Sequence, residues 1–317
     1  MAVYTRIPDD ALAEFVARYA LGKLHDIKDI LSGVENSNFF LTLDAGKFIL
    51  TIYEKRVRDE DLPFFIKLMH HIADKDIPCP APIADKQGHI LQRLCNKPAA
   101  LVSFLNGSMT HAITANHCRQ TGAALAQMHL ATADFQENRT NNLSLEGWAA
   151  LITRCLEKGD RVQAGLTTNL VRELKFLVEH WPNMGSMPYG VIHADLFPDN
   201  VFFSDDKLCG IIDFYFACSD FLAYDLAISI NAWCFDEQHV FQPANAQAML
   251  DGYQSVRPLD AQEKTALPVL CRGAALRFLL TRLYDLLHHP EGALVKPKDP
   301  LEYVAKLKFF QDNPNAV

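Results

Sequence analysis

Residues 189–225 read YGVIHADLFPDNVFFSDDKLCGIIDFYFACSDFLAYD, and the rest of the chain is interpreted outward from this stretch. A short apolar strand at 191–192 leads into a polar loop at 193–200. The residues that follow, 201–212, form two apolar runs around a polar turn at 204–207, which predicts a β-hairpin. Because a hairpin brings its two ends together, the residues just before and just after it are expected to be neighbours.

Three oxygen-bearing side chains stand at these positions: Asp195 in the loop, Asn200 at the start of the hairpin and Asp213 at its end. Carboxylate and amide oxygens suit Mg²⁺, which proteins usually hold with one or two carboxylates together with substrate phosphates. We therefore predict Asn200 and Asp213 as metal ligands. Asp195 then remains to accept the proton of an attacking hydroxyl as the catalytic base, and this is the set of groups that kinase-type phosphoryl transfer uses.

The pattern H-x-D-L-x-x-x-N at 193–200, followed by Asp-Phe at 213–214, resembles the catalytic loop and metal-binding aspartate of the protein-kinase-like superfamily. The small Ala194 and the run Tyr-Asp-Leu-Ala at 224–227 are similar to its aminoglycoside phosphotransferase and choline kinase branch. The resemblance implies an α+β, bilobal protein-kinase-like fold: a small N-terminal lobe with antiparallel sheet and helix, and a larger, mostly helical C-terminal lobe with a catalytic β-hairpin. It also implies ATP and Mg²⁺ as cofactors, and two structural supports for the loop, His193 and Asp225.

The composition disfavours several other classes of protein. The chain has 317 residues, of which 49% are hydrophobic and 21% charged, as in ordinary globular proteins. Thirty basic and 38 acidic side chains give a net charge of −8 without a basic stripe, which disfavours nucleic-acid binding. Neither a membrane span nor a signal peptide is evident. The eight scattered cysteines favour a reducing, cytoplasmic location. The oligomeric state stays open.

The first third of the chain is predicted to form an antiparallel sheet with helices at 10–21 and 59–75. A turn between its first two strands contains Gly33, Asn36, Ser37 and Asn38. Such a turn can present backbone N–H groups to phosphate. A plain hairpin loop has a similar composition, but in the resembled family this turn is the nucleotide-covering loop.

The strand at 48–54 departs from the resembled family, which places Lys or Arg near its centre to hold the nucleotide phosphates. Thr51 stands there instead. Strand alternation puts Lys47 on the same face as Thr51. Lys47, Lys55, or Mg²⁺ with backbone groups are the alternatives for the phosphate contact.

Strand character gives way to helix after Gly107, so we expect a nucleotide-binding lobe at 1–105 and a catalytic and substrate-binding lobe at 106–317. Val102 and Phe104 lie in the predicted hinge, whose backbone would contact the nucleotide base. Helical periodicity predicts helices at 115–132, 168–181, 226–235, 243–256 and 260–288. We interpret His129, in the first of them, as a packing residue.

Longer segments, among them FILTIYEK at 48–55, IPCP at 77–80 and RGAALRF at 272–278, resemble bacterial homoserine kinases over nearly the whole chain. This resemblance implies ATP-dependent phosphorylation of the side-chain hydroxyl of L-homoserine to O-phospho-L-homoserine, in threonine biosynthesis. A small zwitterion requires a cation for its carboxylate, such as Arg277 or Arg282, and an acceptor for its ammonium, such as Asp220. A structural salt bridge is the competing interpretation for each arginine.

Three alternatives stay open. A choline or ethanolamine kinase needs an aromatic cage around a cation, and four residues leave room for one: Tyr215, Phe216, Trp233 and Phe235. An aminoglycoside phosphotransferase needs a strongly acidic site, whereas the segments after Asp213 are only mildly acidic. A kinase fold used as a binding module is the non-enzyme alternative. The intact catalytic set argues against it, and Thr51 argues for it.

Overall fold

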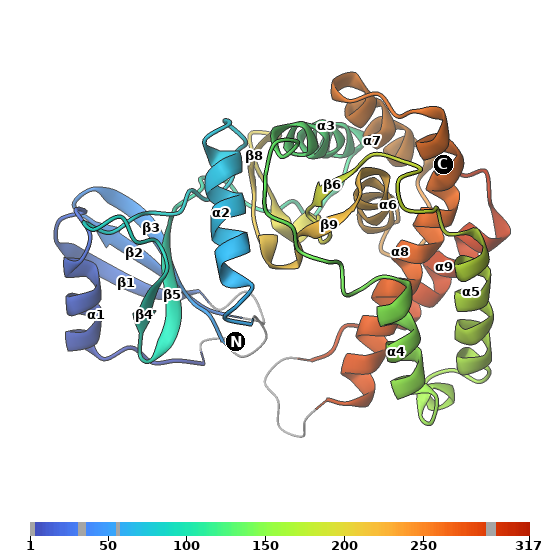
Figure 1. Cartoon of the computed structure of the whole chain (residues 1–317), viewed down its shortest axis with the longest axis horizontal. Helices are drawn as coiled ribbons and strands as arrows, with labels where there is room; N and C mark the ends of the chain where they lie inside the picture. The colour runs from blue at the N-terminus through green and yellow to red at the C-terminus, as the bar shows by residue number, and fades with distance from the viewer. Residues whose placement is uncertain (1–3, 31–35, 55–57, 290–295) are drawn as a thin grey trace. The chain divides into compact units, whose positions relative to one another are not determined.

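The computed structural model describes residues 4–30, 36–54, 58–289 and 296–317. The chain divides into two compact units, residues 1–107 with 209–215 and residues 108–208 with 216–317 (Figure 1). The boundary predicted from the sequence was residue 105. The end of the hairpin, which was assigned to the second lobe, is grouped with the first unit.

The first unit is built on a five-stranded antiparallel sheet with the strand order β1-β2-β3-β5-β4. Its strands are β1 (Leu24–Ile30), β2 (Ser37–Leu43), β3 (Gly46–Ile52), β4 (Gln92–Leu94) and β5 (Lys97–Ser103), and its helices are α1 (Asp9–Ala17) and α2 (Leu62–Ala73). The prediction of an antiparallel sheet with a helix before and after the first strands is confirmed.

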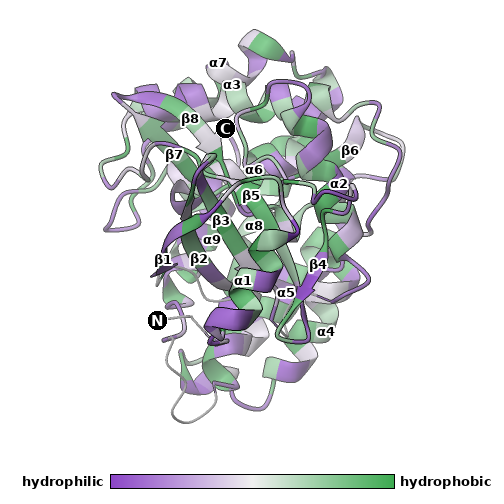
Figure 2. Ribbon diagram, turned by 90° about the vertical axis from the view of Figure 1, so that its left-hand side faces the viewer, coloured by the Kyte–Doolittle hydropathy of each residue, from purple (hydrophilic) through white to green (hydrophobic). Residues whose placement is uncertain are grey.

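Alternation along β3 sorts its side chains between the two faces of the sheet. Phe48, Leu50 and Ile52 are buried in a core that also contains Phe15 of α1. Both β3 and β5 are drawn mainly in green, the apolar end of the scale, in Figure 2. Thr51 therefore lies on the face of the sheet opposite to this core.

The second unit is mostly helical. Its helices are α3 (Ala115–Ala131), α4 (Leu145–Cys155), α5 (Leu166–His180), α6 (Leu222–Trp233), α7 (Pro243–Val256), α8 (Ala261–Leu287) and α9 (Leu301–Asp312). Two short two-stranded sheets follow in the chain: β6 (Tyr189–Ile192) pairs with β9 (Cys218–Phe221), and β7 (Val201–Ser204) pairs with β8 (Lys207–Ile211), whose residues from 209 on are grouped with the first unit. The predicted hairpin is thus the pair β7–β8.

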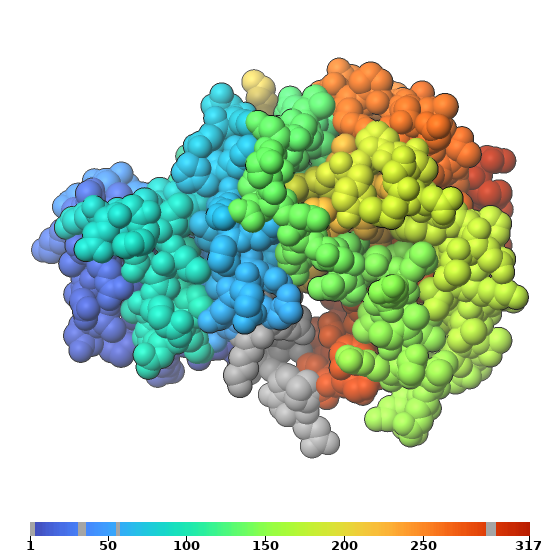
Figure 3. Space-filling view, in the orientation of Figure 1, coloured from blue at the N-terminus to red at the C-terminus, as the bar shows by residue number. Residues whose placement is uncertain are grey.

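Helix α8 organises this unit, because it packs against α4, α5, α6 and α9. A capping box fixes its first turn: the side chain of Asp260 accepts the N–H of Glu263, and the side chain of Glu263 accepts the N–H of Asp260. In the space-filling view α4 and α5 form part of the outer surface of the unit (Figure 3).

Helices α3 and α7 approach each other closely at two glycines. A Cβ atom on Gly122 would lie 2.2 Å from the carbonyl oxygen of Met249, and one on Gly252 would lie 1.9 Å from that of Arg119. Only a residue without a side chain permits this backbone approach. The contact brings together two helices that carry polar residues near the catalytic loop.

The structure differs from the sequence-based expectation in four elements. Strand β9 and helix α9 were not predicted, and both are stabilised by distant partners, β6 and α8. Helix α6 begins at Leu222 rather than at residue 226. Strand β2 begins at Ser37, so part of the predicted loop is strand. No helix in the described part of the chain is long and apolar enough to cross a membrane.

Candidate active site

The loop between β6 and β7 has a strained backbone that buried side chains hold in place. Ala194 adopts a left-handed conformation with φ 62°, which a non-glycine residue keeps only where its surroundings impose it. The carboxylate of Asp225 accepts the N–H of His193 at 2.6 Å and that of Ala194 at 2.8 Å. From the other side, Nη1 of Arg277 donates to the carbonyl oxygen of Ala194 at 2.6 Å. A carboxylate and a guanidinium therefore bracket one strained residue directly before Asp195.

The side chain of Asn200 is tied to Asp195. Its Nδ2 donates to the backbone oxygen of Asp195 at 2.8 Å and to Oδ2 of Asp195 at 3.3 Å. The ring Nδ1 of His193 accepts the N–H of Asp195 at 3.2 Å, and the indole N–H of Trp233 donates to the carbonyl of Leu196 at 2.8 Å. Asp195 itself is partly exposed, while these contacts fix the backbone of the loop on both sides of it.

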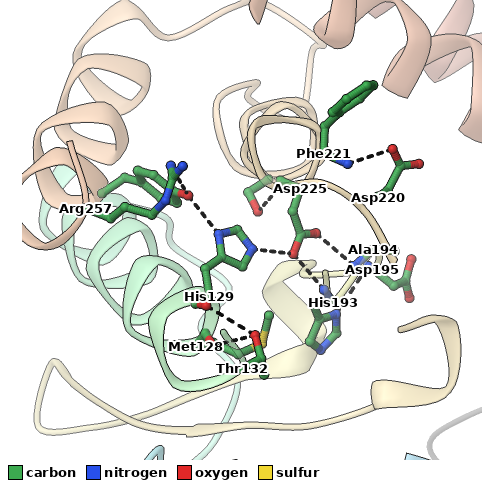
Figure 4. A network of polar contacts seen from close by, with 12 residues as sticks. Met128, His129, Thr132, His193, Ala194, Asp195, Asp220, Phe221, Asp225 and Arg257 are labelled. Atoms are coloured by element: carbon green, nitrogen blue, oxygen red, sulfur yellow. Dashed lines mark hydrogen bonds and ion pairs between the residues drawn. The ribbon is translucent and has the colours of Figure 1, made fainter. Parts of the chain in front are cut away.

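Asp225 is fully buried, and its carboxylate keeps its charge through hydrogen bonds. Burial by itself raises its pKa, but the hydrogen bond from His129 and the contacts from the loop outweigh that effect and hold the pKa below its usual value. These backbone contacts are of the kind expected of Asp225 from the sequence. That they support catalysis is a prediction. His129 was interpreted as a packing residue, and the structure instead places its Nε2 3.1 Å from Asp225 Oδ2 (Figure 4).

The three predicted substrate-binding residues differ in their surroundings. Asp220 is buried, accepts the amide N–H of Asn141 at 2.7 Å, and has a pKa raised mainly by burial. Arg277 is buried with its guanidinium 4.7 Å from the ring centre of Phe278. Arg282, by contrast, is paired with Glu302 at 2.5 Å and donates to the carbonyl of Asp299 at 3.2 Å. These contacts favour the structural ion pair for Arg282.

In the first unit, the polar side chains that were predicted to lie near the nucleotide accept hydrogen bonds from other residues of the same unit. Gly33 and Lys55 lie outside the described residues. Oδ1 of Asn36 accepts the N–H of Glu54 at 3.3 Å, and Oγ of Ser37 accepts the N–H of Tyr4 at 2.8 Å. Oδ1 of Asn38 accepts the hydroxyl of the buried Thr51 at 2.8 Å. Thr51, at the position of the expected cation, thus completes the pairing of β2 with β3.

The predicted hinge residues lie at the end of β5. Val102 pairs with Ile49 of β3. Phe104 packs edge-on against Phe40 at 5.2 Å, and Nζ of Lys47 lies 5.9 Å and 5.8 Å from these two ring centres. Lys47 is thus associated with aromatic rings on the face of β3 that also carries Thr51.

The donor set suits a hard divalent cation. The predicted ligands are Asn200, directly before β7, and Asp213, which follows β8 and has φ 65°. Among the described residues no three His, Cys, Asp or Glu side chains gather as a metal-binding cluster. Carboxylate and amide oxygens are ligands that Mg²⁺ usually combines with phosphate oxygens, and the use of Asn200 and Asp213 for this purpose stays a prediction.

Comparison with known proteins defines the class first. The sequence profile of the phosphotransferase enzyme family matches residues 26–259, and the chain belongs to this family. The fold agrees: the amicoumacin kinase hAmiN, solved in complex with AMP-PNP, Ca²⁺ and Ami, superposes with a TM-score of 0.70 at 14% identity, covering 96% of this chain and 92% of that one. A choline kinase from Cryptosporidium parvum superposes with a TM-score of 0.68 at 14% identity, covering 97% of this chain and 95% of that one. The protein-kinase-like fold predicted from the sequence is confirmed.

The particular relatives are homoserine kinases. The chain is 53% identical to homoserine kinase of Parvibaculum lavamentivorans, covering 98% of this chain and 96% of the relative. It is 55% identical to that of Rhodopseudomonas palustris, covering 98% and 95%. The resemblance to bacterial homoserine kinases seen in the sequence is therefore confirmed over essentially the full length.

Sequence reasoning missed two supports of the loop. Arg277 was considered as a substrate contact or as part of a structural salt bridge, and Trp233 as an aromatic cage residue, but neither was expected to bind the loop. The contacts of these side chains with the loop join residues 83 and 37 positions apart. No local pattern signals such a contact, because it depends on how α6 and α8 pack behind the loop.

Proposed function

We propose that this protein transfers the γ-phosphoryl group of ATP to the side-chain hydroxyl of L-homoserine and forms O-phospho-L-homoserine and ADP. Its similarity to homoserine kinases, at 53–55% identity over nearly the whole chain, carries the proposal. The site supports it, because a partly exposed carboxylate, Asp195, sits on a loop whose backbone is fixed from several sides. In threonine biosynthesis this reaction activates the hydroxyl of homoserine as a leaving group, and we place it in the cytoplasm.

In the proposed reaction Asp195 acts as the general base. Its carboxylate orients the acceptor hydroxyl and takes its proton as the new P–O bond forms, while the bond from the γ-phosphorus to the β,γ-bridging oxygen breaks and ADP leaves. The amide of Asn200, which donates to Oδ2 of Asp195, holds the carboxylate for this step. Asn200 and Asp213 would hold a divalent cation, which we propose to be Mg²⁺, and the cation would neutralise phosphate charge.

Two buried groups are our proposed contacts for the amino acid. Arg277 supplies positive charge beside the catalytic loop, and its Nε has no hydrogen-bond partner among the described residues. It is our candidate for the substrate carboxylate, which an arginine binds with directed, charge-assisted hydrogen bonds. Asp220 is our candidate for the ammonium group. Arg282 is set aside because Glu302 already pairs with it.

For the nucleotide we propose contacts through the backbone rather than through the polar side chains. The side chains of Asn36, Ser37 and Asn38 already accept hydrogen bonds within the first unit. Ser37 and Asn38 also pair across strands, so the main chain of Gly33 and Asn36, before β2, is our first candidate for covering the phosphates, and the backbone at Val102 and Phe104 for contacting the base. Backbone N–H groups are effective phosphate ligands where several point to one place.

The decisive experiment is conversion of ATP to ADP with Mg²⁺ against a panel of acceptors: L-homoserine, choline, ethanolamine and spectinomycin. L-2-Aminobutyrate, which is homoserine without its hydroxyl, serves as the matched control. We expect turnover with homoserine and none with aminobutyrate. Turnover with choline or spectinomycin and not with homoserine would reject the substrate assignment, while leaving the family and fold unchanged.

Two of the four residues considered for a choline-binding aromatic cage have surroundings that argue against this role. Trp233 is fully buried and its indole N–H is bound to the loop. Phe235 packs against Phe241, Phe309 and Phe310, with ring centres 5.3–5.7 Å apart. Both rings are used in packing, so neither presents a free face to a quaternary ammonium group.

A further inference from the structure

A chain of hydrogen bonds links four helices to the catalytic loop, and Figure 4 shows its part from Arg257 to Asp225. It begins at Glu263 on α8, whose Oε1 lies 2.9 Å from Nη1 of Arg257, just after α7. The same Nη1 lies 3.1 Å from the hydroxyl of Tyr253 on α7, and this hydroxyl lies 2.8 Å from Nδ1 of His129 on α3. Nε2 of His129 reaches Oδ2 of Asp225 on α6 at 3.1 Å.

The donor chemistry of Arg257 sets the direction of this chain. A guanidinium has only donors, so the oxygen of Tyr253 must accept from Arg257. Burial raises the pKa of Tyr253, and its hydroxyl therefore keeps its hydrogen. Of the two printed partners of the hydroxyl, only Nδ1 of His129 can accept that hydrogen. Nδ1 then acts as the acceptor, and the ring hydrogen resides on Nε2 and points to Asp225.

Because these side chains are largely buried, water competes little for their hydrogen bonds. The side chains of His129 and Asp225 are 0% exposed, and those of Glu263 and Arg257 are 1% and 12% exposed. Tyr253 is also buried. Inside a protein, linked hydrogen bonds polarise one another and an unmatched donor or acceptor is costly. A single orientation and tautomer of the His129 imidazole satisfies every donor and acceptor in this hydrogen-bond chain.

With the imidazole in this orientation, both carboxylate oxygens of Asp225 accept hydrogen bonds. Oδ2 of Asp225 receives hydrogens from Nε2 of His129 and from the N–H of His193, and Oδ1 receives the N–H of Ala194. If Nε2 lost its hydrogen, its lone pair would face a carboxylate oxygen. The repulsion would then displace the carboxylate from the two loop N–H groups that it binds. The strained Ala194, and Asp195 after it, would lose that support.

We propose that Tyr253 and Arg257 are positioning residues for the catalytic loop: they fix the Nε2–H tautomer of His129, which locks Asp225 onto the backbone of His193 and Ala194. The role in turnover rests on the proposed kinase function. The tautomer itself does not, and it can be measured without activity.

The first test is ¹⁵N NMR of the full chain labelled at histidine, compared between wild type and Tyr253→Phe. Wild type should show His129, assigned through His129→Gln, as a single neutral Nε2–H tautomer. Tyr253→Phe removes the hydrogen that Nδ1 accepts, so we expect the Nδ1 signal to shift by tens of parts per million or to average between tautomers. A wild-type spectrum in Tyr253→Phe would overturn the proposal.

The second test compares two arginines in similar ion pairs. Arg272 is paired with Glu173 at 2.6 Å, and the two side chains are 16% and 3% exposed. This ion pair is not part of the hydrogen-bond chain that leads to Asp225. Arg257→Met should lower kcat with homoserine about tenfold with little change in either KM, as expected when a positioned base is slightly displaced. Arg272→Met should cost stability without that loss of kcat per folded molecule. Equal losses in both variants would contradict the proposal.

Arg257→Lys provides the conservative rescue. Lysine also has only donors, so the direction of the chain should be kept, and both the His129 spectrum and kcat should return towards wild type. If neither returns while the variant is folded, the donor argument is wrong. If wild type shows no turnover with homoserine, the proposed function fails, and the NMR comparison still tests the tautomer.

Discussion

Two short polar segments of this protein, the loop at 193–200 in the second unit and the residues at 36–38 in the first, use their polar groups in opposite ways. In the loop, side chains from distant helices, Asp225 and Arg277 among them, bind the backbone. At 36–38 the segment's own side chains bind within the sheet and its N-terminal segment. The first arrangement keeps the side chain of Asp195 for chemistry. The second arrangement uses the polar side chains of its segment to stabilise the first unit.

The substitution with the largest expected effect on this contrast is Asp195→Asn. The amide has nearly the same shape but does not accept the proton, so kcat should fall by about 10²- to 10⁴-fold, the usual contribution of a general base. The matched control is Asp199→Asn, because Asp199 is exposed and only loosely paired with Lys298 at 3.7 Å. Steady-state ATP turnover checks both. Equal turnover in wild type and Asp195→Asn would remove the catalytic role.

A second test removes the guanidinium that holds the loop. Arg277→Met deletes the donor to the carbonyl of Ala194, so the free energy of unfolding should fall by about 2–3 kcal/mol, and kcat should fall as well. Arg282→Met, on the same helix, breaks the pair with Glu302 and should lower stability while kcat stays near wild type. Urea unfolding and turnover are measured on both. If Arg282→Met lost more kcat than Arg277→Met, their roles would be exchanged.

The pair of Glu302 with Arg282 and Lys306 predicts a pH dependence of stability. Burial by itself raises the pKa of Glu302, but the two cations outweigh it and lower the pKa from 4.5 to about 2. A lowered acid pKa stabilises the fold above the unfolded value. That stability is lost as pH falls from about 4.5 towards 2, and by linkage it amounts to at most about 3 kcal/mol.

Glu302→Gln should therefore flatten the fall in unfolding free energy between pH 5 and pH 3, in a denaturant series at each pH. Wild type measured in parallel supplies the reference slope. An unchanged slope in the variant would show that Glu302 is not the group responsible.

The smallest expected effect belongs to the first unit. Thr51→Val keeps the shape of the side chain and removes its hydrogen bond to Asn38, so stability should fall by about 1 kcal/mol. The KM for ATP should stay within about twofold, because Thr51 completes strand pairing in our interpretation. Thermal unfolding and ATP titration check this. A large rise in the KM for ATP with unchanged stability would make Thr51 a nucleotide contact and weaken the contrast between the two segments.

Local sequence predicted the parts of the fold that depend on neighbouring residues. The hairpin β7–β8 follows from two apolar runs around a polar turn, and α8 follows from helical periodicity over 260–288. Strand β9 was not predicted because its four residues, Cys-Ser-Asp-Phe, have no clear alternation and depend on pairing with β6. The start of β2 was taken for loop because Ser37 and Asn38 are typical turn residues, whereas cross-strand partners hold them extended.

The sequence by itself determined the chemistry of this protein: the residue types and spacing at 193–200, with Asp213 and the longer similar segments, identify a phosphotransferase and point to homoserine. Only the tertiary structure decided which groups hold that chemistry in place. Arg277, Trp233 and the path from Arg257 through Tyr253 and His129 to Asp225 act across tens of residues. The physical reason is that a motif records the groups that react, whereas the strained backbone beneath them is stabilised by buried partners that become neighbours only when the helices pack.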